Sequence, residues 1–216
     1  MLATDVTEPL PGGSSLLRNE PVQARSSARL TGLLDAAAAI IDEIGYERLT
    51  TAMVAERAGA SIGTVYRYFP DRIAVVDALA LRSLQRLSQR VTDSVSDDTV
   101  TTWQQAVAVV VDSTVEMYRS EPGFRAIRFG DSPDRDEVDA ASAVRSPLTE
   151  HVLGLLVDRF AVVRTAETEL ALETVVEIGN ALLARAFVTG GDGDQRFIDE
   201  CRRVVTLTLD SRVTVG

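Results

Sequence analysis

Apolar residues recur at intervals of three and four along most of this 216-residue chain, and this helical period constrains its fold more than any other feature. No stretch alternates apolar and polar residues for long enough to suggest a strand, and no internal repeat is visible. The sequence therefore predicts an all-α fold. After Ser26, the first amphipathic face is formed by Leu30, Leu33, Leu34, Ala37, Ile41 and Ile44.

Residues 1–25 precede this pattern and differ from it in composition. Proline and glycine residues between Pro9 and Gly13 interrupt any regular period, so we expect a flexible N-terminal arm. The next segment, residues 26–72, has the pattern of a small domain of short helices. The remainder, residues 73–216, is predicted to form a second helical domain.

Turn and capping residues set the expected helix limits in the first domain. Gly45 and Gly59 are suited to end two helices, because glycine adopts the left-handed conformation common at helix ends. Thr51, Ser61 and Asp71 are suited to begin the following helices, because their side chains can accept hydrogen bonds from first-turn N–H groups. Three closely spaced helices and a longer fourth are therefore predicted.

Four more helices are expected further along the chain. The first ends at the Glu-Pro-Gly sequence of residues 121–123, and a short segment of one or two turns follows it. Ser146 is predicted to cap the next helix, with Pro147 at its first position, where the missing N–H costs nothing. The last two helices are predicted at about 166–189 and 193–211.

The composition excludes several classes of protein. No run of about 18 apolar residues is present, so no membrane span is predicted, and the N-terminus does not resemble a secretory signal. Cys201 and His151 are single, and all 22 basic residues are arginine, so neither a zinc site nor a catalytic constellation is expected. We therefore expect a cytoplasmic protein that is not an enzyme and carries no metal or cofactor.

Charge is distributed unevenly along the chain. The formal net charge is −10, yet residues 25–90 carry nine arginines against seven acidic residues. Residues 91–216 carry twelve arginines against twenty-two acidic residues. An anionic partner is therefore expected only on the segment 25–90, and on one face of it.

The stretch from Ala58 to Phe69 joins a tight turn at Gly59 to a short helix with two tyrosines and an arginine. Two short helices joined by such a turn form a helix-turn-helix motif, whose second helix enters the DNA major groove. The alternative is a structural hairpin with surface tyrosines. Candidates to face base edges are Ser61, Ile62, Gly63 and Thr64, and candidates to hold phosphates are Tyr66, Arg67, Tyr68 and Arg72.

The segment from about Leu33 to Leu79 resembles the DNA-binding domain of the TetR family of bacterial repressors. Matching stretches include Gly45-Tyr46, Leu49-Thr50-Thr51, Val54-Ala55, Ala58-Gly59-Ala60-Ser61, Gly63 to Phe69, and Asp71-Arg72. The resemblance implies that Thr51, Ala52, Ile62, Gly63 and Thr64 face the groove or its edge, and that Tyr66, Arg67, Tyr68 and Arg72 hold phosphates.

Three positions affect how DNA would be read. Arg72 stands where the family usually has lysine, so the charge is kept. Ile62 stands where a polar or basic residue is common, and it can offer only apolar contact, such as to a thymine methyl group. Ala52 is too short to hydrogen-bond to a base. We therefore expect DNA shape to contribute to recognition.

The resemblance also implies a division of labour between the two domains. Members of the family are homodimers whose C-terminal helices form a ligand pocket and the dimer interface. In the last two predicted helices, Gly179, Ala181, Ala184 and Ala186 would allow two copies to approach closely. Packing of these residues inside one monomer is the alternative.

The implied pocket would lie among the helices that begin near residues 100, 124 and 147. It would be mostly apolar, with a few orienting groups, and would take a hydrophobic or aromatic small molecule. Ordinary core packing is the alternative for the apolar candidates, and exposure to solvent is the alternative for His151. The candidates are Trp103, Val107, Val110, Thr114, Met117, Phe124, Ile127, Arg128, Leu148, His151, Val152 and Leu155.

Together these features predict a ligand-responsive, DNA-binding transcriptional regulator, most often a repressor. As a homodimer it would bind a palindromic duplex operator, and a hydrophobic effector would release it by shifting the population of conformations through the fourth helix. One alternative is a dimeric DNA-binding protein without an effector. A remote alternative is an enzyme that uses the C-terminal pocket, which the missing catalytic residues disfavour.

Overall fold

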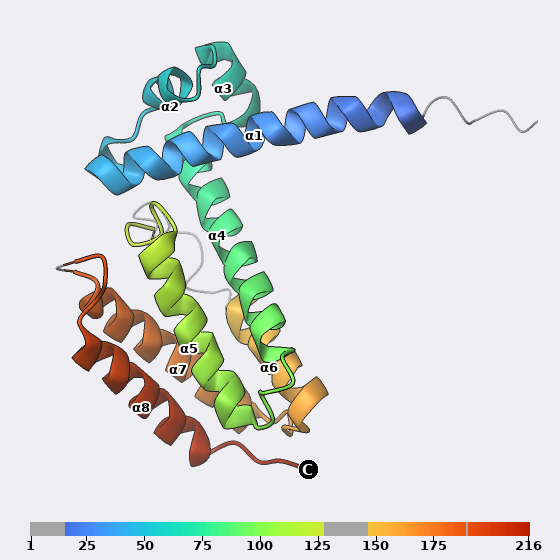
Figure 1. Ribbon diagram of the computed structural model, residues 1–216, viewed down its shortest axis with the longest axis vertical. Coiled ribbons are helices and arrows are strands. Elements are labelled where there is room, and N and C mark those ends of the chain that lie inside the picture. Colours follow the sequence, from blue (N-terminus) through green and yellow to red (C-terminus); the bar gives the residue numbers. More distant parts are fainter. Residues whose placement is uncertain (1–15, 128–146, 189) are drawn as a thin grey trace, which may run out of the picture.

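A computed structural model describes residues 16–127, 147–188 and 190–216, and these residues fold into helices joined by turns (Figure 1). No β-strand occurs within these ranges; a single isolated antiparallel bridge pairs Val162 with Val215. The predicted all-α fold is confirmed.

The N-terminal part consists of a long helix, a 3₁₀ turn and the first short helices. In Figure 1, α1 crosses below α2 and α3, while α4 leads from this part toward the remaining helices. The elements are α1 (Leu16–Ile44), η1 (Tyr46–Arg48), α2 (Thr51–Arg57), α3 (Ile62–Tyr68) and α4 (Arg72–Val95).

The start of α1 differs from the prediction. The helix begins at Leu16, whereas the amphipathic pattern placed its start at Ser26 and assigned the preceding residues to a flexible arm. Extending an existing helix costs far less than nucleating one, which favours continuing α1 toward the N-terminus beyond Ser26. Residues 1–15 of the predicted arm lie outside the described residues.

Side-chain caps begin the short helices. Ser61 and Asp71 cap α3 and α4 as predicted, accepting hydrogen bonds from the backbone N–H three residues on, at 3.2 and 2.8 Å. The prediction that Thr51 caps α2 is wrong, because Thr50 accepts that bond and Thr51 is already helical. Leu49 is only 1% exposed, and its anchoring in the core leaves Thr50 as the extended residue before the helix.

The N-terminal helices close around one apolar core. Val75 and Leu79 from the first turns of α4 belong to it, so this packing unit extends past residue 72, the domain boundary proposed from the sequence. Each fully buried large apolar side chain stabilises such a core by about 1.5–3 kcal/mol. The other large buried side chains are Leu33, Leu34, Ile40, Ile41, Leu49, Val54, Val65, Phe69 and Ile127.

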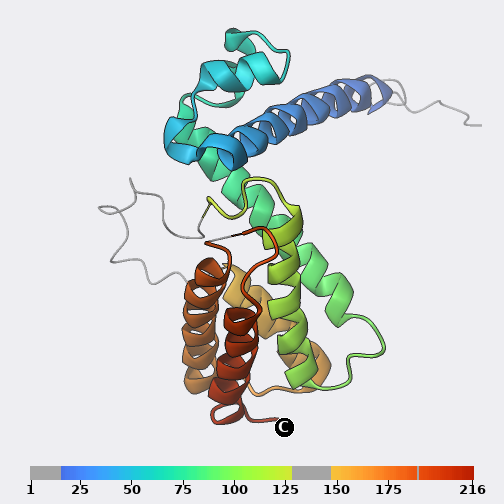
Figure 2. The same ribbon diagram turned by 60° about the vertical axis from the view of Figure 1, so that its left-hand side comes forward.

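Four helices form the C-terminal part. Figures 1 and 2 show α7 and α8 side by side, with α5 running between them and α4. Their apolar faces, together with one face of α4, enclose a second core. The elements are α5 (Trp103–Ser120), α6 (Pro147–Phe160), α7 (Ala166–Ala186) and α8 (Gln195–Asp210).

The predicted limits of these helices are mostly close to the observed ones. Pro147 occupies the first position of α6 as predicted, while Ser146 lies outside the described residues. α7 ends at Ala186, before the predicted residue 189. α5 ends before the Glu-Pro-Gly sequence, and the short segment predicted to follow it forms a series of turns as far as residue 127, where the described part ends.

The turn at residues 121–127 joins the end of α5 to α1. The Gly123 N–H donates to Asp42 Oδ1 of α1 at 3.3 Å. Gly123 has a φ of +76°, and a Cβ there would lie 3.0 Å from the carbonyl oxygen of Ala38, so a side chain would be strained. Ile127 packs in the N-terminal core. The two parts of the chain are therefore joined by this turn as well as by α4.

Three aromatic side chains hold the turn on its other side. Tyr118 of α5 stacks on Phe187 with ring centroids 4.7 Å apart, and Phe124 meets Tyr118 edge-on at 5.0 Å. Both arrangements are favoured by the charge distribution of aromatic rings. The end of α5, the turn and the end of α7 are thus packed together.

Candidate nucleic-acid interface and apolar cavity

α3 turns one face to the N-terminal core and the other to solvent. Val65 and Phe69 are 0% and 4% exposed, whereas Ile62 and Tyr66 are 43% and 54% exposed. Gly63 lies on the exposed side as well. Large apolar and aromatic side chains left open on a short helix are typical of a surface that a partner covers.

The start of α2 borders this exposed face of α3. The Thr51 hydroxyl donates a long hydrogen bond, 3.4 Å, to the Tyr66 hydroxyl. The neighbouring Ala52 is exposed. Groove residues predicted from two separate helices therefore lie on one surface, which we call the α2–α3 surface: Thr51, Ala52, Ser61, Ile62, Gly63, Thr64, Tyr66 and Arg67.

Two hydroxyl groups fix the first turn of α3. Ser61 Oγ accepts from the Thr64 N–H, and the two hydroxyl oxygens lie 2.9 Å apart. Thr64 is half-buried, and its hydroxyl already has the Ser61 hydroxyl as a partner within the turn. A contact from Thr64 to a base edge would have to share or replace that hydrogen bond.

Tyr68 points to α1 and not outward with Tyr66. Its hydroxyl lies 3.0 Å from Ser26 Oγ and donates a longer bond to the Ser26 carbonyl at 3.4 Å. The Ser26 hydrogen bond is the main cause that lowers the pKa of Tyr68, and the nearby Arg67 and Arg29 add to it. The Arg67 guanidinium also lies 5.2 Å from the centre of the Tyr68 ring. The Tyr68 hydroxyl therefore ties α3 to α1.

Arg72 opens α4 at the edge of the α2–α3 surface. Its Nη1 donates to the carbonyl oxygen of Glu47 at 2.7 Å, and the residue is exposed. A guanidinium has five N–H donors, so this bond leaves others free while it fixes the position of the group.

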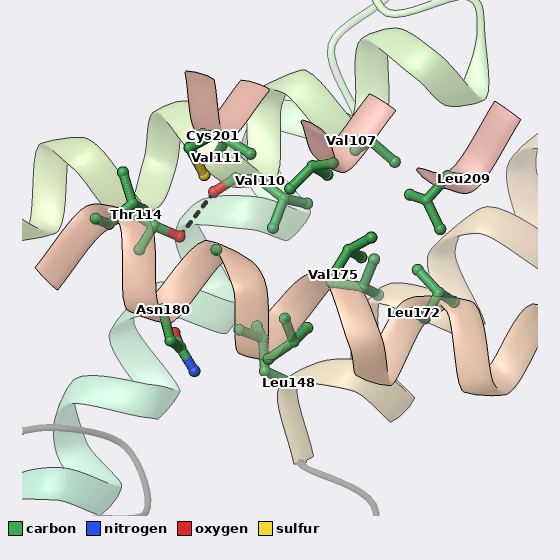
Figure 3. A pocket seen from close by; sticks show the side chains of 15 residues that line it. Val107, Val110, Val111, Thr114, Leu148, Leu172, Val175, Asn180, Cys201 and Leu209 are labelled. Atoms are coloured by element: carbon green, nitrogen blue, oxygen red, sulfur yellow. Dashed lines mark hydrogen bonds between the residues drawn. The ribbon is translucent and has the colours of Figure 1, made fainter. Parts of the chain in front are cut away.

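A small cavity of about 60 Å³ lies in the C-terminal core, where α5, α6, α7 and α8 meet (Figure 3). Its walls are apolar except at Thr114, Asn180 and the thiol of Cys201. The Thr114 hydroxyl donates to the Val110 carbonyl at 2.8 Å. The lining residues are Val107, Val110, Val111, Thr114, Leu148, Val152, Leu172, Val175, Val176, Gly179, Asn180, Leu183, Cys201, Val205 and Leu209.

Only some of the pocket residues predicted from the sequence line this cavity. Arg128 lies outside the described residues. Trp103, Met117, Phe124, Ile127, His151 and Leu155 do not line this cavity. The candidates that do line it are Val107, Val110, Thr114, Leu148 and Val152.

The candidates away from the cavity have other packing roles. Met117 and Phe124 are 0% and 2% exposed and fill the core near the end of α5, and Ile127 belongs to the N-terminal core. Trp103 is buried in the C-terminal core at the start of α5. Leu155 is partly buried against the same core.

His151 fastens α6 to α4. Its Nε2 lies 2.9 Å from Thr92 Oγ1 and 3.1 Å from the Ser88 carbonyl oxygen. The Thr92 hydroxyl already donates its proton to that same carbonyl, so both oxygens can only accept from the histidine. In the tautomer that carries its hydrogen on Nε2, this N–H donates to both oxygens. The histidine is half-buried between two helices, rather than exposed or in the cavity.

Sequence reasoning missed the contribution of α7 and α8 to the cavity. A Cβ at Gly179 would lie 3.8 Å from Cys201 Sγ, so the absent side chain helps to leave this space open. The sequence predicts Gly179 at the contact between two copies of the chain and not at a cavity wall. Cys201 is fully buried, and burial raises the pKa of its thiol to about 11, which makes it an inert wall residue.

Neither a cluster of metal ligands nor a membrane-spanning helix is found in the part of the chain that the structure describes. Within ranges 16–127, 147–188 and 190–216, no three His, Cys, Asp or Glu side chains gather to hold a metal ion. None of the helices described there is both long and apolar enough to cross a membrane.

Comparison with known protein families identifies both parts of the chain. Residues 33–79 match the model described as "Bacterial regulatory proteins, tetR family". Residues 102–207 match the model described as "Tetracyclin repressor-like, C-terminal domain". The first match contains the α2–α3 surface, and the second contains every residue that lines the cavity except Leu209.

Individual relatives agree with these matches. A crystal structure of a TetR-family transcriptional regulator from Streptomyces coelicolor is 33% identical, with a TM-score of 0.74 over 86% of this chain and 98% of that one. The transcriptional repressor KstR of Mycolicibacterium smegmatis is 33% identical over 50% of this chain and 54% of its own length. The nucleoid occlusion factor SlmA of Pasteurella multocida is 33% identical over 41% and 43%. The alignments thus span about half the length of these curated relatives.

Proposed function

Because this chain belongs to the TetR family of bacterial regulatory proteins, we propose that it is a ligand-responsive transcriptional repressor. It binds a palindromic DNA operator as a homodimer in the cytoplasm, and an apolar small molecule in the α5–α8 cavity releases it. Members of this family are DNA-binding regulators and not enzymes.

The exposed side of α3 is the observation that carries this proposal. A seven-residue helix with its apolar face fully packed, capped at its start by Ser61, presents Ile62, Gly63 and Tyr66 to solvent. The absence of a side chain at Gly63 allows the backbone to approach a groove closely. KstR, which shares part of this sequence, is a transcriptional repressor, and this supports repression as the output.

Different residues of the α2–α3 surface have different roles in this proposal. Ile62, Gly63 and Thr64 face the base edges, and Thr51 and Ala52 lie at the groove wall. Tyr66, Arg67 and Arg72 hold phosphates, which positions the helix without reading sequence. Tyr68, whose hydroxyl is bound to Ser26, positions α1 against α3.

The homodimer uses the outer face of α7 and α8. Leu170 and Leu207 are 58% and 55% exposed there, and Ala181 is exposed as well. Gly179 and Ala186, also predicted to lie in the interface, instead face the interior of the monomer. The two-fold pairing of these helices would cover the exposed leucines and form a four-helix interface.

The cavity volume determines how an effector must bind. About 60 Å³ is the space of two water molecules, whereas ligand pockets usually enclose about 300–1,000 Å³. The effector therefore binds a second, expanded conformation and shifts the population toward it. Shifting the equilibrium almost completely requires about a 10⁴-fold preference for that conformation.

Expansion of the cavity is transmitted through α5 as well as α4. Val107, Val110 and Thr114 of α5 line the cavity, and the same helix ends at the turn that holds α1 through Gly123 and Ile127. A displacement of α5 therefore moves the N-terminal core relative to α8 and to the dimer partner. The spacing of the two recognition helices then no longer fits successive major grooves.

The test is a release experiment on the bound duplex. The homodimer is loaded on a fluorescent duplex selected from random DNA, and a panel of neutral or weakly anionic aromatic and aliphatic compounds is added while anisotropy is recorded. We expect some apolar compounds to release DNA and polyols and polyamines to have no effect. If no duplex is bound at any salt concentration, the proposal fails at its first step.

A second candidate function is a dimeric DNA-binding protein without an effector. The small size of the cavity supports it, and the relative SlmA is a nucleoid occlusion factor. The two functions are separated by thermal unfolding in the presence of the same compounds. Under the second, no compound raises the unfolding temperature or changes the affinity for DNA.

A further inference from the structure

The N-terminal half of α1 extends beyond the core that holds the rest of the helix. Figures 1 and 2 both show it projecting past α2 and α3. Residues 25–29 are all exposed, and Leu33 is the first buried residue among those described. Residues 25–29 therefore gain little from packing within their own chain, and a partner outside the chain is the natural source of further stabilisation.

A groove lies between this part of α1 and the end of α3. Arg25 and Arg29 are one helical turn apart, so they share one face of α1. Together with Arg67 and Tyr68 of α3 they line a groove of about 840 Å³. None of the described residues that line it is acidic; the others are Ser26, Ala28, Gly32, Leu33 and Ala58.

The three arginines of this groove differ from others in the same part of the chain. Arg57 and Arg82 are paired with Glu43 and Asp35 at 2.6 Å. Arg25, Arg29 and Arg67, like Arg48 and Arg72, form no ion pair with any residue whose side chain the structure describes. We call the groove that these three residues line the arginine groove. In a chain of net charge −10, three such guanidinium groups in one groove are suited to a polyanion.

The arginine groove is continuous with the α2–α3 surface. Arg67 follows Gly63 by four residues on α3, so the groove begins where the surface that faces the bases ends. The hydrogen bond between Ser26 and Tyr68 fixes α1 beside α3. An extended anion that passes along α3 can therefore continue into the groove without a break.

We propose that the arginine groove binds the sugar–phosphate backbone of the DNA that flanks each half-site, with Arg25 and Arg29 as the additional contacts. This rests on the proposed function, because the half-site itself is read by α3. From Leu33 to Arg25 the helix extends by about 12 Å at 1.5 Å per residue. At about 3.4 Å per base pair, this length equals three or four base pairs and sets the scale of the flanking DNA that the helix can reach.

The experiment compares two lengths of the same DNA. A palindromic duplex obtained by in vitro selection is trimmed to its outermost selected base pairs, and a second duplex adds eight arbitrary base pairs at each end. Binding of the full chain and of R25A/R29A is measured by anisotropy over a range of salt concentrations. The control is R90A/R212A, which removes the same charge from positions outside the groove and the α2–α3 surface. Circular dichroism checks that each variant is folded.

We expect the wild type to bind the extended duplex at least tenfold more tightly than the trimmed one. R25A/R29A should lose that gain while keeping its affinity for the trimmed duplex, and its salt slope on the extended duplex should fall by about 0.9 for each lost phosphate contact. R90A/R212A should keep the gain.

Two results would overturn the inference while leaving the proposed function intact. One is equal affinity of the wild type for both lengths. The other is an equal loss for R25A/R29A on both lengths, which would place these arginines on the half-site. Failure of the wild type to bind either duplex would instead refute the proposed function and this inference with it.

Discussion

The hydroxyl oxygens of Thr51 and Tyr66 lie 3.4 Å apart, which joins the start of α2 to the exposed face of α3. Two helices that are separated by a turn thus present their polar groups as one surface. The hydrogen bond is long, so the Tyr66 hydroxyl remains available to a stronger acceptor such as a phosphate oxygen.

Replacing Tyr66 by phenylalanine should weaken DNA binding about equally for all sequences. The change removes one hydrogen bond to a charged phosphate, which corresponds to roughly 1.5–3 kcal/mol. The fold should not change, because Tyr66 is 54% exposed. Competition binding against a set of single-base operator variants checks this prediction; a loss restricted to one base pair would mean that Tyr66 contacts a base.

Arg72→Ala should also weaken binding to all sequences, and here the salt dependence is diagnostic. The slope of log affinity against log salt should fall by about 0.9 for each phosphate contact removed. Thr64→Ala is the contrasting variant, and we expect it to change which bases are preferred. If Arg72→Ala leaves the salt slope unchanged, its bond to the Glu47 carbonyl is structural only.

Val107→Trp should block the effector response while leaving DNA binding intact. The added volume fills the cavity that Val107 lines between α5 and α8. Val163→Trp, at a position 39% exposed and outside the cavity, is the matched control. The measurement is release of labelled DNA by an active compound. A Val107→Trp protein that still responds fully would place the effector elsewhere.

Gly123→Ala should lower the free energy of unfolding by about 1–3 kcal/mol, because a side chain is strained at φ +76°. It should also weaken the contact between the turn and α1, where a Cβ would lie 3.0 Å from the Ala38 carbonyl oxygen. Gly154→Ala in α6 is the control, because its Cβ would meet open space and alanine favours the helix. Calorimetry compares the two, and equal unfolding temperatures would contradict the assigned strain.

Cys201 should not react with thiol reagents in the folded protein at pH 8, since burial raises the pKa of its thiol to about 11 from an ordinary value of 9.0. As the pH rises, the Cys201 thiol loses its proton in the unfolded chain before it does so in the folded protein, which favours unfolding. The contribution of the buried neutral thiol to the free energy of unfolding is therefore complete below about pH 9 and declines toward pH 11. A colorimetric disulfide reagent, with and without urea, checks this. Rapid reaction of the native protein would show that the α7–α8 contact opens readily.

The local structure of the α2–α3 surface could be predicted from the sequence because its signals are local. The turn at Gly59, the caps Ser61 and Asp71, and the exposed positions of α3 all depend on residues within a few positions of one another. The cap of α2 was misplaced by one residue because two adjacent threonines are equivalent until the burial of Leu49 distinguishes them.

The cavity could be predicted only in part, because it depends on contacts between distant segments. The helical spacing of apolar residues indicates that Met117 and Phe124 are buried. It cannot show that these two side chains are closely packed whereas Val107 lines a cavity. The α7 and α8 walls come from residues far along the chain, such as Gly179 opposite Cys201. Likewise, nothing local to His151 indicates that it meets α4.

In vitro selection of binding sites from random duplex DNA, followed by hydroxyl-radical footprinting of the complex, shows whether the chain binds an operator as a homodimer. We expect a palindrome whose two half-sites are protected on one face of the duplex, with centres separated by about one helical turn or a multiple of it. We also expect two chains, or four, on each site. Selection of no sequence, or of a single asymmetric half-site occupied by one chain, would contradict this expectation.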